Sequence, residues 1–100
     1  DEADLLLAAV SRKGSGWERS KAGDGVQEAR TSSTSWCRGA CTAEDIVVGV
    51  SRRIEELTGV PTENCEYMQF LRYDAGQYYR RHHDQNAQRA SAWGPRLYTF

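Results

Sequence analysis

The sequence predicts one small α+β domain whose strands form a β-barrel or sandwich. A long amphipathic helical pattern, several short strand-like runs and turn signals at intervals of roughly 8–12 residues predict this class. One hundred residues with 39% hydrophobic content suffice for one core, much of it filled by three Trp and five Tyr. The net charge of −1 gives no support to a nucleic-acid partner or an anionic membrane surface.

The first predicted element is a helix over residues 3–12, where an apolar run precedes Gly14. Residues 14–27 are polar and glycine-rich, which is typical of a loop or an irregular sheet edge. Residues 26–37 are rich in Thr and Ser and predict an extended segment followed by an exposed loop.

The clearest predicted helix starts at Thr42, the expected N-cap, with Asp45 three residues later as the acid of a capping box. Gly59 is expected to end it, because glycine adopts the left-handed conformation without steric cost, and Pro61 prevents continuation. We expect the helix to pack on a sheet through apolar residues at helical spacing, namely Ile46, Val47, Val50, Ile54 and Leu57.

The C-terminal half predicts strands. Successive side chains of residues 66–73 are expected to face opposite sides of a strand. Met68 and Phe70 face one side, and Tyr67, Leu71 and their neighbours face the other. Residues 74–76 predict a turn, residues 77–84 a return to extended structure and residues 96–100 a final strand. Residues 85–95 are polar and irregular, and Trp93 is expected to anchor this loop.

His82 and Asp84 are the most informative pair. Residues two apart on a strand share a face, so this imidazole and carboxylate can converge on one metal ion, whereas His83 points the other way. They would supply two of the three ligands of a 2-His-1-carboxylate Fe(II) site. Taken alone, the pair is more typical of a solvated polar turn, and the flanking residues decide in favour of the metal site.

The flanking residues resemble the prolyl 4-hydroxylase family of 2-oxoglutarate- and Fe(II)-dependent dioxygenases. The runs 66–73 (EYMQFLRY), 76–77 (GQ) and 79–84 (YRRHHD) resemble that family's strand, turn and metal-binding strand. The run 30–36 (RTSSTSW) resembles its substrate loop, and 53–61 its helix and following turn. The resemblance covers about residues 28–100 in the correct order.

This resemblance implies a double-stranded β-helix (jelly-roll) core with supporting N-terminal helices. It implies hydroxylation of peptidyl proline with Fe(II), 2-oxoglutarate and O2, and leaves ascorbate open as a further cofactor. Residues 1–100 are expected to be the N-terminal portion of one catalytic domain, truncated after the first metal-binding strands. Alone they are expected to be inactive, because the family's second metal-binding His and its 2-oxoglutarate-binding Lys or Arg would lie beyond Phe100.

The resemblance also assigns roles to residues. His82 and Asp84 would bind the metal, and Tyr73 would hydrogen-bond 2-oxoglutarate. Tyr79 and Arg96 would lie near the reacting proline, although an ideal strand puts Tyr79 and His82 on opposite faces unless a bulge intervenes. Residues expected to bind the peptide are Arg30, Ser32, Trp36 and Glu66.

Each role has a plainer alternative. Tyr73 could be a core aromatic, Arg96 a solubilising charge at a strand edge, Trp36 a plug beneath the loop and Glu66 a solvated strand residue. The rival function is a non-catalytic module that binds proline-rich peptides and keeps the fold without a working iron site.

Cys37 and Cys41 could close a small disulfide loop or contribute to a zinc site. No second Cys/His pair with suitable spacing follows, which argues against structural zinc. A disulfide would fit the endoplasmic reticulum lumen or secretory pathway, where many members of the resembled family work. Cys65 is expected to be a free thiol. The sequence shows no transmembrane run and no signal peptide, so no membrane contact is expected from this segment.

Overall fold

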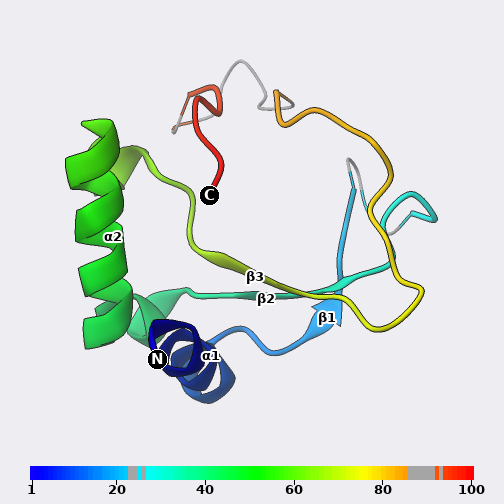
Figure 1. Cartoon of the computed structure of the whole chain (residues 1–100), viewed down its shortest axis with the longest axis horizontal. Helices are drawn as coiled ribbons and strands as arrows, with labels where there is room; N and C mark the ends of the chain where they lie inside the picture. Colours follow the sequence, from blue (N-terminus) through cyan, green and yellow to red (C-terminus); the bar gives the residue numbers. More distant parts are fainter. Residues whose placement is uncertain (23–24, 26, 86–91, 93) are drawn as a thin grey trace.

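A computed structural model describes residues 1–22, 25, 27–85, 92 and 94–100. Three short strands form an antiparallel sheet in the order β1-β2-β3 (Figure 1). The edge strand β1 (Glu18–Arg19) pairs with the central strand β2 (Ser33–Trp36), which pairs with β3 (Gln69–Arg72). The predicted α+β class is therefore confirmed. The jelly-roll core is not, because the described residues form only this sheet.

Two helices complete the scaffold. Helix α1 (Glu2–Lys13) begins with a capping box in which Asp1 accepts the backbone N–H of Asp4 at 3.0 Å. Helix α2 (Asp45–Thr58) ends as predicted at Gly59, whose φ of 70° lies in the left-handed region. Short 3₁₀ helices η1 (Gly39–Ala43) and η2 (Thr62–Asn64) flank α2. No helix in the described ranges has the length and apolar character to span a bilayer.

The predicted N-cap of α2 is wrong. Thr42 lies within η1, where its hydroxyl donates to the Gly39 carbonyl at 2.7 Å, and Glu44 occupies the cap position without a capping side-chain hydrogen bond. The hydroxyl is already used by the preceding turn, so it cannot satisfy the first N–H groups of the helix.

The core lies between the two helices and one side of the sheet. Its buried members are Ala9, Cys37, Cys41 and Val47, and partly buried Leu6, Ile46, Met68 and Phe70 pack against them. The predicted alternation in β3 is confirmed, because Met68 and Phe70 face this core. Leu57 is an exception to the predicted apolar face of α2, with 76% of its surface exposed; it lies in the last turn, beyond the core cluster.

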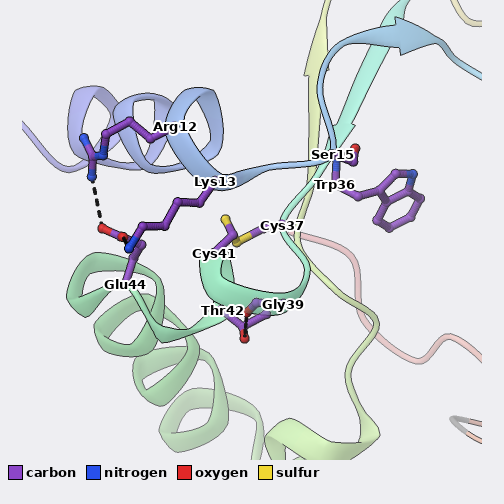
Figure 2. The surroundings of a disulfide bond; sticks show 9 residues. All are labelled: Arg12, Lys13, Ser15, Trp36, Cys37, Gly39, Cys41, Thr42 and Glu44. Carbon is purple, nitrogen blue, oxygen red and sulfur yellow. Dashed lines mark hydrogen bonds and ion pairs between the residues drawn. A yellow bond between two sulfur atoms is a disulfide. The ribbon is translucent and has the colours of Figure 1, made fainter.

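A disulfide joins Cys37, which follows β2, to Cys41 in η1 (Figure 2). Both cysteines are fully buried. Beside the bond, Glu44 forms ion pairs with Lys13 at 2.6 Å and Arg12 at 3.0 Å. Hydrogen bonding to Lys13, reinforced by Arg12, lowers the pKa of the Glu44 carboxyl below 4.5 despite partial desolvation. The end of α1 is thus fastened to the start of α2.

Two expected strands are absent from the described residues. The segment 77–84 makes only one isolated bridge, between Arg30 and Tyr79. Residues 96–100 form no strand, and the backbone carbonyl of Arg96 instead accepts a hydrogen bond from the side-chain amide of Gln85. The predicted turn at residues 74–76 is confirmed, with Gly76 at φ 85° and a hydrogen bond from Gln77 N–H to the Asp74 carbonyl. Trp93, the expected loop anchor, lies outside the described residues.

Candidate functional site

His82 and Asp84 point at one another. His82 Nε2 lies 3.4 Å from Asp84 Oδ1, and both side chains keep about a third of their surface exposed, at 36% and 37%. His82 Nδ1 lies 2.7 Å from the Arg80 carbonyl, so the tautomer that donates from Nδ1 leaves the Nε2 lone pair directed at Asp84. Two cis ligands at about 2.1 Å from one octahedral ion lie about 3 Å apart, so this pair fits a shared metal ion.

A stack of side chains, buried only at its Arg30 end, supports the imidazole. The Tyr79 ring lies 3.6 Å from the His82 ring, centroid to centroid, at an interplanar angle of 17°. The guanidinium of Arg30 lies over the Tyr79 ring, and its Cζ is 4.3 Å from the ring centroid. Arg30 is only 8% exposed and donates from Nη1 to the Lys21 carbonyl at 3.1 Å. Arg30, Tyr79 and His82 therefore form a continuous column.

Backbone pairing explains how residues so distant in sequence build this column. The Thr31 N–H donates to the Tyr78 carbonyl at 2.9 Å, and the Arg80 N–H donates to the Ala29 carbonyl at 2.8 Å. These bonds flank the bridge between Arg30 and Tyr79. The strand extension before β2 thus places Arg30 against the segment that carries the metal-binding candidates.

Arg96 and Glu66 form the second part of the site. Arg96 Nη2 donates to Glu66 Oε2 at 3.0 Å, and Arg96 Nε donates to the other carboxylate oxygen. The hydrogen bond to Glu66 raises the pKa of Arg96 above its already high usual value, against an opposing desolvation, and Asp84 and Tyr79 contribute attraction from nearby. Arg96 is therefore a fixed positive charge between Glu66 and the metal-binding pair.

One broad open hollow collects the predicted residues. Its lining includes every proposed site residue except Ser32, namely Arg30, Trp36, Glu66, Tyr73, Tyr79, His82, Asp84 and Arg96. Ser32 is fully buried and donates to the Ser20 hydroxyl at 2.9 Å. Tyr73 lies just beyond β3 and is 45% exposed.

The expected substrate loop is not an exposed loop in the structure. Residues Ser33–Trp36 form the central strand β2, and Arg30, Ser32, Thr34 and Ser35 are buried. Hydroxyl-to-hydroxyl bonds link Ser20 to Ser32 and to Thr34 and so satisfy polar groups that the sequence pattern assigns to solvent, whereas the Ser35 hydroxyl is buried without such a partner. The role of these residues toward a peptide stays a prediction.

Two further residues join the site. Thr99 donates its hydroxyl to Asp84 Oδ2 at 2.9 Å, which occupies the carboxylate oxygen that faces away from His82. Nothing in the sequence pattern marks Thr99. Arg38 lies beside the Trp36 ring. Its position two residues after Trp36 is the one sequence feature that connects it with the site.

The described residues bring together two candidate metal ligands and not a full set. No group of three or more His, Cys, Asp or Glu side chains in those ranges is arranged to hold an ion. His83 is exposed and is not part of the pair.

Comparison with known proteins gives two curated relatives. Prolyl 4-hydroxylase 1 of Arabidopsis thaliana is 38% identical over 65 residues, which is 64% of this chain and 23% of that protein. Probable prolyl 4-hydroxylase 8 of the same plant is 44% identical over 41 residues, which is 41% of this chain and 14% of that protein. The matched stretches thus span less than a quarter of either relative. No protein-family model and no solved structure matches the chain.

Proposed function

We propose that the full-length protein is a member of the prolyl 4-hydroxylase family, which its matched stretch resembles, and that it hydroxylates peptidyl proline with Fe(II), 2-oxoglutarate and O2. The observation that carries this proposal is the His82–Asp84 pair, whose 3.4 Å separation suits two ligands of one ion. Because the described residues supply two ligands, the proposal requires a third from elsewhere in the protein.

The proposed site contains residues that would hold the iron, residues that orient these ligands and a residue that would bind 2-oxoglutarate. His82 Nε2 and Asp84 Oδ1 would hold the iron, which supplies the oxidation chemistry together with 2-oxoglutarate and O2. The Arg80 carbonyl fixes the tautomer of His82, and the Tyr79 ring fixes its plane. The Thr99 hydroxyl holds the second oxygen of Asp84. Tyr73, at the open end of β3, is the proposed hydrogen-bond donor to 2-oxoglutarate.

Arg96 and Glu66 are the proposed contacts for the peptide beside the target proline. Their mutual ion pair holds both side chains at the rim of the hollow, close to Tyr79 and Asp84. A guanidinium fixed in this way can donate to a backbone carbonyl of the peptide without rearranging. Trp36 offers a flat aromatic surface of the kind that proline-rich segments pack against.

Metal titration tests the proposal most directly. We expect His82→Ala and Asp84→Ala variants of the full-length protein to lose Mn(II) binding measured by calorimetry, while His83→Ala keeps it. The wild type should also convert 2-oxoglutarate to succinate and add the mass of one oxygen to a proline-rich peptide. Equal loss of metal in all three variants would overturn the ligand assignment.

The rival function is a peptide-binding module without catalysis. The specific observation in its favour is that the described residues do not complete a metal site. A full-length protein that binds proline-rich peptides but neither binds Mn(II) nor forms succinate would establish this rival.

We also propose that the protein works in an oxidising compartment such as the endoplasmic reticulum lumen. The disulfide between Cys37 and Cys41 supports this, because such bonds persist where thiols are not kept reduced. Intact-mass analysis after alkylation of the protein isolated from its source should find Cys65 alkylated and the other two cysteines protected until reduction.

A further inference from the structure

A cationic aromatic cluster lines the same hollow as the His82–Asp84 pair. The Arg38 guanidinium lies 5.1 Å from the Trp36 ring centroid and 5.7 Å from that of Tyr67. Both distances are within the range of cation–π attraction, so one guanidinium contacts two rings. We call these residues, Trp36, Arg38 and Tyr67, the arginine ledge.

The ledge is built where β2 ends and the disulfide begins. Trp36 ends β2, and the next residue, Cys37, donates its N–H to the Met68 carbonyl at 3.0 Å. Trp36 pairs with Gln69 in the antiparallel register of β2 and β3, so continuing that register past this bond sets Arg38 opposite Tyr67. The disulfide then holds Cys37 to Cys41, whose N–H donates to the Arg38 carbonyl at 3.2 Å. In Figure 2 the Trp36 ring points away from the disulfide.

The guanidinium has binding capacity left over. Arg38 is exposed, and among the described residues no carboxylate forms an ion pair with it. Aromatic contacts use the face of a guanidinium, whereas its N–H donors lie in its plane and match the two oxygens of a carboxylate. The ring contacts thus hold the charge in place while its donors stay available.

The ledge and the metal-binding pair share one surface. Trp36, Arg38 and Tyr67 line the same hollow as Tyr79, His82 and Asp84. We propose that the ledge binds an acidic residue of the substrate, so that the preferred substrate is a proline-rich peptide with an Asp or Glu near the hydroxylated proline. This inference rests on the proposed function and adds to it a substrate class and a residue that determines specificity.

The fold limits the distance between that acid and the proline. Arg30 lies on Tyr79, and the chain runs from Arg30 to Trp36 in extended form. Six residues at about 3.3 Å each span at most about 20 Å. A polyproline II peptide advances about 3.1 Å per residue, so the acid is expected within about six residues of the hydroxylated proline.

Binding and turnover of matched peptides test this inference in the full-length protein. The peptides share one proline-rich sequence and carry Glu, Gln or Lys at one position, moved in steps from two to seven residues away on either side of the target. For wild type we expect the best Glu peptide to bind about two- to five-fold more tightly than its Gln counterpart, the range for an exposed ion pair. Raising the ionic strength should reduce this ratio.

Variants of the ledge separate charge from folding. Arg38→Gln should remove the preference for Glu, and Arg38→Glu should reverse it in favour of the Lys peptide. Arg72→Gln is the matched control, because Arg72 also lies over an aromatic ring, 5.3 Å from the centroid of Trp17, but outside the hollow. It should keep the wild-type ratio.

The outcomes distinguish this inference from the proposed function. Hydroxylation of all three peptides with equal dissociation constants at every position would overturn the inference and leave the proposed function standing. Preferential binding of Glu peptides without hydroxylation would overturn the proposed function and leave the binding preference of the ledge standing. The wild-type comparison needs no variant, so misfolding of an Arg38 variant does not affect it.

Discussion

The disulfide between Cys37 and Cys41 offers the best-defined test of how the scaffold holds the site. The bond closes a ring with a sequence separation of 4, from the end of β2 into η1. In the chain-entropy description, closing a loop of about five residues stabilises the folded state by about 2 kcal/mol, less than the ~3 kcal/mol for a 15-residue loop. Reduction should therefore cost about 2 kcal/mol of unfolding free energy.

Both cysteines are fully buried, so a reductant reaches them only after unfolding. We expect full-length protein refolded in reductant to unfold at a urea concentration about 1–2 M lower than oxidised protein, for a denaturant slope of about 1–2 kcal/mol/M. Circular dichroism of the helices measures the midpoint. Cys65→Ala is the control, because Cys65 is a half-buried free thiol outside the ring. Identical urea midpoints for oxidised and reduced protein would refute the reasoning. It would also be refuted if Cys65→Ala lowered the midpoint as much as reduction of the disulfide does.

Two further predictions concern single charges. Glu44→Gln should lower the unfolding free energy at neutral pH, because it removes the ion pair with Lys13. The lowered pKa of Glu44 means that the wild-type advantage is present above 4.5 and is lost as pH falls through the folded-state pKa, so thermal melts of the two proteins should converge in acid. Arg30→Met should weaken Mn(II) binding by about two- to thirty-fold, the value of one buried cation–π contact with Tyr79, whereas Arg30→Lys should retain part of it. Unchanged calorimetric affinity in Arg30→Met would show that the column does not orient the ligand.

Helix α2 shows what periodicity can and cannot predict. Its existence, the burial of Val47 and its end at Gly59 follow from apolar spacing and from the left-handed preference of glycine, whereas Leu57 on the predicted apolar face is exposed. Its start does not follow, because the chain enters the helix through a 3₁₀ turn closed by a disulfide. A capping pattern cannot reveal that the Thr42 hydroxyl is already bonded to Gly39.

The central strand shows a different limit. A run of Ser and Thr is typical of a loop, yet Ser33–Trp36 is the middle strand of the sheet. Small hydroxyl side chains can be buried where neighbours supply partners, as Ser20 does for Ser32. Those partners come from a segment twelve residues away, so no local pattern identifies them.

The metal-binding pair shows how an irregular backbone can improve on an ideal one. In a regular strand Tyr79 and His82 would face opposite ways. Here the chain is held to Arg30 by one bridge at Tyr79 and then leaves the strand path, so the two rings stack at 3.6 Å. The His82 imidazole is thereby fixed twice, in its plane by Tyr79 and in its rotation by the Arg80 carbonyl. With those two constraints met, Nε2 points toward Asp84, which is the direction that the proposed shared metal ion would require.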